Sequence, residues 1–198
     1  MFVTFEGIDG SGKSTQARLL AEALAADGRD VVATREPGGT DAGERIRELI
    51  LSGPEVAPWT EAALFAAARA QLVEEVIAPA LARGADVVCD RYLDSSLAYQ
   101  GIARGLGVER VLELNVHAIR GILPDRTFLL LVDPEESARR LREPGDRIER
   151  EDEAFRARVA EAYEELAAAF PQRIVALDGT RPPVELAREI LEGVRQHS

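Results

Sequence analysis

A segment near the start of the chain has the residue types and spacing of a phosphate-binding loop. The pattern G-x-x-x-x-G-K-[ST] is matched in full by Gly7-Ile8-Asp9-Gly10-Ser11-Gly12-Lys13-Ser14, and Thr15 follows it. Glycines in such a loop let backbone N–H groups point at phosphate oxygens, the lysine reaches the β- and γ-phosphates, and the serine hydroxyl can bind Mg²⁺. We therefore predict that residues 7–15 bind the phosphates of a nucleoside triphosphate. A glycine-rich turn without a ligand is the alternative.

The loop alone does not separate kinases from GTPase switches, motor ATPases or DNA-translocating enzymes. The chain has 24 basic residues, and Lys13 is its only lysine. A guanine-specific N-K-x-D motif after the loop is therefore impossible, which excludes the switch GTPases. The formal net charge of -11 argues against a sequence-nonspecific nucleic-acid binder, because such proteins need a basic face to replace the counterions of phosphates.

A carboxylate and a guanidinium stand side by side after the apolar run Asp86 to Asp90, in Asp90-Arg91-Tyr92. Asp90 could hold Mg²⁺ through water or orient Arg91. The planar fork of Arg91 could bridge the donor and acceptor phosphates. A surface ion pair is the alternative. A second candidate carboxylate, Asp133, is better explained as the cap of a helix, since Pro134 and Glu136 follow it.

Two further segments could hold an acceptor. Arg35 follows another apolar run and precedes the turn Glu36-Pro37-Gly38-Gly39-Thr40, so it is placed to bind a phosphate. Phe65 and Arg69 are four residues apart and share one face of a predicted helix. An aromatic ring there could stack on a base while the arginine donates to a carbonyl at the edge of the base. Core packing is the alternative for Phe65.

The elements that must position these residues follow an alternating pattern. Segments with helical spacing separate five short apolar runs, which are Phe2 to Glu6, Asp30 to Thr34, Asp86 to Asp90, Thr127 to Val132 and Arg173 to Leu177. This alternation predicts an α/β fold with a five-stranded parallel sheet flanked by helices, as one domain over residues 1–198. Ligands of such sheets bind beyond the carboxyl ends of the strands, where the candidate residues lie.

The composition of the chain indicates where the protein is located and which chemistry its cysteine can do. No apolar run approaches the roughly 20 residues of a membrane helix, and Met1 leads into Phe2 without a basic segment, so we expect a cytoplasmic protein with no membrane partner. Cys89 is the only cysteine, which excludes an internal disulfide and a multi-cysteine metal site. Its apolar surroundings predict inert burial.

Together these motifs resemble those of the thymidylate kinases, in the expected order and over nearly the whole chain. The resemblance rests on the loop with Asp9 inside it, Thr34 to Thr40, Phe65 with Arg69, Asp90-Arg91-Tyr92, Ser96 to Gln100, and Asp146-Arg147-Ile148-Glu149. It implies the nucleoside-monophosphate-kinase form of the P-loop NTPase fold. It also implies ATP as donor, dTMP as acceptor, Mg²⁺ as cofactor and a homodimer.

The resemblance also implies residue roles. Asp9 would accept a hydrogen bond from the deoxyribose 3′-OH, and Arg35 and Arg91 would hold the dTMP phosphate. The base would be stacked on Phe65, with Arg69 meeting thymine O4. The remaining contacts would come from one helix: Ser96 and Gln100 at the other edge of the pyrimidine and Tyr99 against a ribose 2′-OH. Capping of the helix start is the alternative for Ser96.

The resemblance places the chain with the bacterial-type enzymes, because the loop carries no arginine and the lid would supply one. The predicted short lid, residues 139–150, is arginine-rich and broken by Pro144-Gly145, and a solvated charge run is its alternative. Catalysis would consist of positioning and charge neutralisation by Lys13, Mg²⁺, Arg91 and a lid arginine, with Arg147 the first candidate and Arg142 the second. A kinase for another small acceptor, or a nucleotide-dependent binding protein, remain the other functions to test.

Overall fold

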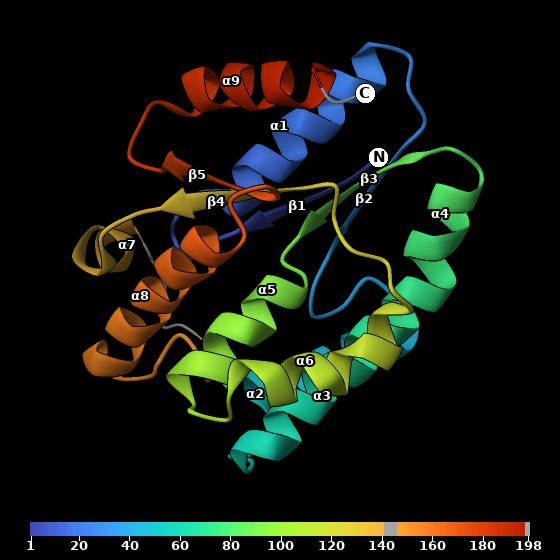
Figure 1. Cartoon of the computed structure of the whole chain (residues 1–198). Coiled ribbons are helices and arrows are strands. Elements are labelled where there is room, and N and C mark those ends of the chain that lie inside the picture. Colours follow the sequence, from blue (N-terminus) through green and yellow to red (C-terminus); the bar gives the residue numbers. More distant parts are fainter. Residues whose placement is uncertain (141–145, 197–198) are drawn as a thin grey trace.

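The computed structural model describes residues 1–140 and 146–196, and its centre is a five-stranded parallel sheet (Figure 1). The strand order is β2-β3-β1-β4-β5. The strands are β1 Phe2–Glu6, β2 Val31–Arg35, β3 Asp86–Asp90, β4 Arg126–Leu131 and β5 Ile174–Asp178. The predicted fold class is confirmed. The predicted bounds of β1 and β3 are those observed, and each of the other three strands is displaced by one residue.

Helices cover both faces of the sheet (Figure 1). On one face, α1 Lys13–Ala26 and α9 Pro183–Arg195 enclose a core that includes Val3, Phe5 and Val88. The helices that build the core on the other face are α3 Pro58–Leu72 with its π-helical extension Val73–Ile77 and α4 Ala78–Ala82, α5 Leu93–Ser96 with its π-helical extension Leu97–Ala103, α6 Val108–Ile119 and α8 Glu153–Ala169. α2 Asp41–Ser52 packs beside α3, and α7 Pro134–Arg140 follows β4.

Successive side chains of β1 point to opposite faces of the sheet, and this alternation places Glu6 in the interior. Val3 and Phe5 belong to the core under α1, whereas Phe2 belongs to the opposite core and packs edge-on against Tyr92. Because successive side chains of a strand point to opposite faces, Glu6 shares the face of Phe2. A carboxylate is thereby buried, at 1% exposure, under the start of α5.

The register of the strands brings two candidate residues, Asp90 and Arg35, level with one another. Asp90 at the end of β3 pairs with Phe5 of β1 on one side and with Arg35 of β2 on the other. The carboxyl ends of the strands therefore meet at one edge, as the sequence predicts for the ligand-binding edge. Cys89, one residue earlier, is fully buried.

Within the described parts of the chain, none of the helices combines the length and the apolar character that crossing a bilayer requires.

The core supporting α3 offers a test of the fold. Leu72 is fully buried, whereas Leu123 is 51% exposed. We expect Leu72→Ala to lower the free energy of unfolding by about 2–5 kcal/mol because it leaves a cavity, and Leu123→Ala to change it by less than about 1 kcal/mol. Urea unfolding of both variants measures this difference. Equal effects of the two substitutions would contradict the packing described for α3.

Candidate active site

The phosphate-binding loop connects β1 to α1, and its backbone leaves N–H groups available. Gly10 and Gly12 have φ values of 77° and 98°, a left-handed region that other residues rarely adopt. No side chain caps the start of α1, where Gly12 is the N-cap residue. The free N–H groups and the helix dipole at this end favour an anion.

Lys13 and Ser11 add side-chain groups to the loop. The Lys13 ammonium donates to the backbone oxygen of Ile8 (3.1 Å) and to Asp9 Oδ1 (3.2 Å). Its side chain is almost wholly buried, and burial together with the nearby Arg91 lowers the pKa of Lys13. The hydroxyl of Ser11 is buried and finds no hydrogen-bond partner among residues 1–140 and 146–196. Both side chains thus line a loop shaped for phosphate oxygens.

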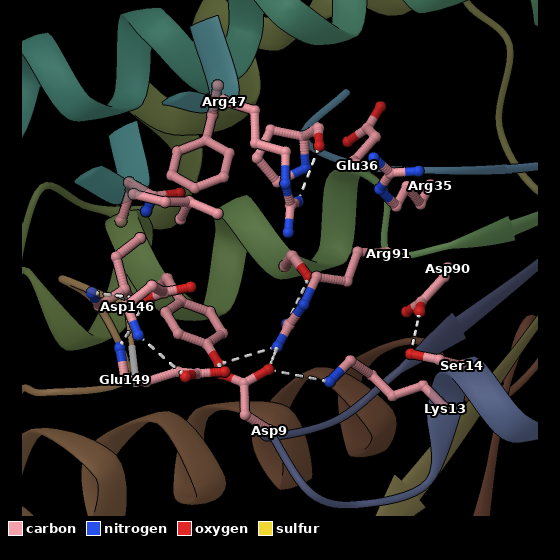
Figure 2. Close-up of a pocket in the computed structure, with 17 residues that line it drawn as sticks. Asp9, Lys13, Ser14, Arg35, Glu36, Arg47, Asp90, Arg91, Asp146 and Glu149 are labelled. Atoms are coloured by element: carbon pink, nitrogen blue, oxygen red, sulfur yellow. Dashed lines mark hydrogen bonds and ion pairs between the residues drawn. The ribbon is translucent and has the colours of Figure 1, made fainter. Parts of the chain in front are cut away.

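Asp9 and Arg91 form an ion pair at the mouth of the loop (Figure 2). Burial alone would raise the pKa of Asp9, but Arg91 and Lys13 outweigh burial and hold the pKa of this carboxyl well below its usual range. The guanidinium of Arg91 also lies over the ring of Tyr99, 5.2 Å from its centroid. Asp9 is therefore ionised and can accept hydrogen bonds. The ion pair with Asp9 and the ring of Tyr99 together fix the orientation of the Arg91 guanidinium.

The buried carboxylate of Glu6 holds the two hydroxyl groups that orient the Arg91 side chain. Glu6 accepts hydrogen bonds from the backbone N–H of Tyr92 (2.8 Å), the hydroxyl of Ser95 (2.6 Å) and the phenol of Tyr163 (2.9 Å). Arg91 in turn donates to Ser95 Oγ (3.1 Å) and to the Tyr163 oxygen (3.2 Å). Burial, assisted by the charge of Asp94, raises the pKa of Glu6 to about 7.

Two oxygen ligands beside the loop fit a magnesium ion. Ser14 donates to Asp90 Oδ2 at 2.5 Å, and Asp90 Oδ1 is buried without a partner in the described structure. Hydroxyl and carboxylate oxygens are the ligands that Mg²⁺ prefers, and it usually takes only one or two from the protein, with phosphate and water as the others. The described residues contain no group of three or more potential metal-binding side chains, which agrees with such a sparse site.

A cavity joins this edge of the sheet to α3 and the extension of α5 (Figure 2). Nine of the predicted site residues line it: Asp9, Lys13, Ser14, Arg35, Phe65, Asp90, Arg91, Tyr99 and Gln100. Arg35 is half exposed and pairs with Glu44 at 2.9 Å. One cavity therefore connects the phosphate-binding loop with an aromatic ring of a size that can stack on a base.

Arg69 and Ser96 do not line this cavity. Arg69 is fully buried, and each of its five N–H groups has a partner. It donates to Glu36, Ser96, Asn115 and the backbone oxygen of Tyr92. The expected contact of Arg69 with a base carbonyl is therefore not supported by its position, because a new acceptor would have to displace an existing one. The adjacent Ser95 lines the cavity instead of Ser96.

The two candidate lid arginines have different positions. Arg147 donates to Glu61 Oε2 (2.8 Å) and to the backbone oxygen of Ile50 (2.8 Å), and its side chain is 12% exposed. It does not line the cavity, so this position does not support a contact with the transferred phosphoryl group. Arg142, the second candidate, lies outside the described residues.

Several residues of the cavity carried no recognisable sequence signal. Arg47 projects from α2, donates to the backbone oxygen of Pro37 (2.9 Å) and enters the cavity (Figure 2). Asp146 and Glu149 belong to a segment that we singled out for its arginines, yet its acidic residues are the ones that line the cavity. Glu6 lies beneath the cavity and is the last residue of β1, one residue before the loop. Only the alternation of side chains along β1, which turns Glu6 toward the interior, could have indicated its role from the sequence.

A second opening also borders the loop. Its lining includes Ser11 and Gly12 of the loop, Arg140 at the end of α7, and Thr180 and Arg181 after β5. Arg140 donates to the backbone oxygens of Gly10 (3.4 Å) and Gly179 (3.0 Å). The loop thus borders both this opening and the cavity that Phe65 lines.

The fold and the site define a P-loop phosphotransferase, with a phosphate-binding loop that borders two openings. The family model described as thymidylate kinase matches residues 5–190. The chain is 47% identical to the thymidylate kinase of Exiguobacterium sp. over 97% of its own length and 92% of that protein. It is 50% identical to that of Bifidobacterium longum (strain NCC 2705) over 91% and 90% of the two chains. The crystal structure of thymidylate kinase from Ehrlichia chaffeensis superposes with a TM-score of 0.81, at 34% identity and 98% coverage of both chains.

The chain therefore belongs to the thymidylate kinase family, as its motifs predict, and is an enzyme of the nucleoside-monophosphate kinase class.

The buried Glu6 carboxylate should make stability depend on pH. Since the pKa of Glu6 in the folded protein is about 7, above the ordinary glutamate value of 4.5, the folded state binds more protons than the unfolded state between these values. The contribution of Glu6 to stability is therefore fully present below pH ~4.5 and is lost as the pH rises through 7. The loss is on the order of 3 kcal/mol.

Glu6→Gln keeps the shape and removes this titration. Urea unfolding between pH 5 and pH 8 should show that the variant loses less stability than the wild type as the pH rises. Glu22→Gln is the matched control, because Glu22 is an exposed partner of Arg18. Parallel pH profiles for Glu6→Gln and the wild type would show that Glu6 does not titrate in this range.

Proposed function

We propose that the chain is a thymidylate kinase that transfers the γ-phosphoryl group of ATP to dTMP, giving dTDP and ADP for dTTP synthesis. One observation carries the proposal: Lys13 of the phosphate-binding loop, Arg91 after β3 and Phe65 of α3 line one cavity. A donor phosphate on the loop and a base on Phe65 would bring the two reacting phosphates together at Arg91.

Positioning and charge neutralisation account for the reaction. The phosphate of dTMP is already anionic at neutral pH, so no general base is needed. Arg91 and Arg35 would hold it in line with the γ-phosphate, which Lys13 would bind from the loop. Ser14 and Asp90 would hold Mg²⁺, which when bound with ATP neutralises charge on the phosphate oxygens. The hydroxyls of Ser95 and Tyr163, fixed by Glu6, keep Arg91 aimed at this point.

The nucleoside contacts follow from the remaining groups. Phe65 would stack on the base, and the ionised carboxylate of Asp9 would accept from the 3′-OH. Tyr99, whose phenol accepts a hydrogen bond from Arg91 (3.3 Å), would occupy the space that a ribose 2′-OH needs. Gln100 would meet the edge of the pyrimidine. The roles of Arg69 and Ser96 would be to support these groups from behind the cavity.

The donor nucleoside would occupy the second opening. Arg140 and Thr180 flank it, and Ser11 and Gly12 connect it to the phosphates. The lid would comprise residues 139–150, and Arg140 is already in contact with the loop through Gly10. An arginine from this segment would complete the charge balance during transfer, and Arg142 becomes the first candidate because Arg147 donates to Glu61 and to the backbone of Ile50.

The protein would act as a homodimer in the cytoplasm, where its charged substrates ATP and dTMP are retained. Exposed apolar side chains on three neighbouring helices support the dimer: Leu49 of α2 (42% exposed), Trp59 of α3 (45%) and Val116 of α6 (47%). A second copy packing on these helices would remove them from water.

An assay of ADP formation with different acceptors tests the proposal. The panel comprises dTMP, dUMP, dCMP, dGMP and AMP, and we expect the highest kcat/KM with dTMP. A higher value with another acceptor would identify a different small-molecule kinase. Slow ATP hydrolysis that no acceptor accelerates would instead favour a nucleotide-dependent binding protein.

Phe65→Ala tests the stacking surface. We expect it to weaken dTMP binding by about 1–3 kcal/mol, the range for a base on an aromatic ring, with little change in ATP affinity. Isothermal titration with each nucleotide measures both affinities. Phe170→Ala is the matched control, since Phe170 is an exposed ring at the end of α8. A large loss of thermal stability with normal dTMP binding would assign Phe65 to the core.

Arg147→Ala separates a structural role from a catalytic one. Because Arg147 is held by Glu61 and the backbone of Ile50, we expect a loss of about 1.5–3 kcal/mol in unfolding free energy and a change in kcat of less than about tenfold. A fall in kcat of roughly 10³–10⁵ without loss of stability would instead identify the lid arginine that neutralises the transition state. Arg188→Ala, on the exposed side of α9, is the control, and Arg142→Ala completes the kinetic series.

A further inference from the structure

A carboxylate in the first turns of α3 binds one end of the amide of Gln100. Glu61 is 2% exposed, and its Oε1 accepts a hydrogen bond from Gln100 Nε2 at 3.0 Å. The same carboxylate accepts from Arg104 Nε (3.3 Å) and Nη2 (3.2 Å) and from Arg147 Nη2 (2.8 Å). Gln100 itself lines the cavity that holds Phe65, whereas Glu61 does not.

The charge of Glu61 decides which end of the amide faces it. Burial opposes ionisation, but the hydrogen bonds from Arg104, Gln100 and Arg147 outweigh it and lower the pKa of Glu61. An ionised carboxylate can only accept hydrogen bonds, whereas a glutamine amide has a donor end and an acceptor end. Gln100 must therefore turn Nε2 to Glu61, so that Oε1 is the end left for a ligand.

We propose that Glu61 is a positioning residue that sets pyrimidine specificity, by holding the Gln100 amide with its oxygen available to the base. The inference rests on the proposed function. Thymine carries an N–H donor at N3, which the Gln100 oxygen can accept, whereas cytosine carries a lone pair at N3 that the oxygen repels.

The first test removes the constraint on the amide. In Glu61→Gln the side chain at position 61 can donate or accept, so Gln100 can present either end to the base. The acceptors are dTMP and 5-methyl-dCMP, which share the 5-methyl group and differ only at N3 and C4. We expect the ratio of their kcat/KM values to fall at least about tenfold in the variant, since a buried group left unpaired underlies such discrimination.

Glu151→Gln is the matched control for this experiment. Glu151 accepts from Arg104 Nη2, whereas the Gln100 amide donates to Glu61, so the substitution removes a carboxylate from the same cluster and leaves the partner of the amide in place. We expect it to leave the acceptor ratio unchanged. If Glu61→Gln lowers kcat/KM equally for both acceptors, Glu61 merely supports the fold and the inference is overturned.

A second test uses the wild-type protein and needs no variant to fold. The probes are 5-methyl-dCMP and its 3-deaza analogue, in which a C–H group replaces N3, and inhibition constants against dTMP are measured. With the amide oxygen held toward the base, removing the N3 lone pair relieves repulsion, so the analogue should bind several-fold more tightly. With a freely turning amide, the lone pair would accept from Nε2, and the analogue would bind more weakly. The second result overturns the inference.

These outcomes are separable from those of the proposed function. The wild type could phosphorylate dTMP while Glu61→Gln leaves the ratio of kcat/KM values unchanged and the 3-deaza analogue binds more weakly. In that case only the role of Glu61 fails. If no acceptor stimulates ADP formation, the proposed function and the inference both fail.

Discussion

The ion pair between Asp9 and Arg91 is the contact on which the arrangement of the site depends. It joins the phosphate-binding loop to the end of β3, two segments that are 82 residues apart in the chain. Arg91 has a positive φ of 70°, which costs free energy for a non-glycine residue and persists only where the surroundings determine it. Those surroundings are the backbone hydrogen bond from Arg91 to Phe5, the ring of Tyr99 and the hydroxyls above Glu6.

Behind this contact, three buried carboxylates hold groups that line the cavity or lie beside it. Glu6 fixes the hydroxyls that aim Arg91, Glu36 neutralises Arg69, and Glu61 binds Gln100. Removing such charges from water is costly, and a buried pair adds little net stability compared with apolar packing of the same volume. The orientation that these carboxylates impose on their partners offers a physical reason for burying them. An ionised carboxylate can only accept hydrogen bonds, so each partner must turn a donor group toward it.

The chain is acidic overall, yet three arginines line the cavity beside the phosphate-binding loop. Arg35, Arg47 and Arg91 converge there from β2, α2 and the end of β3. The acidic surface elsewhere does not prevent this, because exposed charges are screened within about 10 Å at ordinary ionic strength. The arginines meet there beside acidic side chains of the same lining, so the net charge of -11 does not by itself describe the groups that face a ligand.

The sequence by itself determined the five strands, their parallel arrangement and the edge at which ligands bind. The alternation of apolar runs with helical segments and the spacing of residues in the loop are local patterns, which can be recognised within a short stretch of sequence. Nine of the predicted site residues meet in one cavity for the same reason: each directly follows a strand or occupies a fixed position on a helix. Only the tertiary structure decided what each polar side chain binds. Arg69 and Arg147 read as ligand contacts in the sequence, yet their donors are engaged by carboxylates 33 and 86 residues away. Conversely, Glu6 and Glu61 read as ordinary helix or strand residues. The partner of a buried charge is set by long-range packing, which no local pattern encodes.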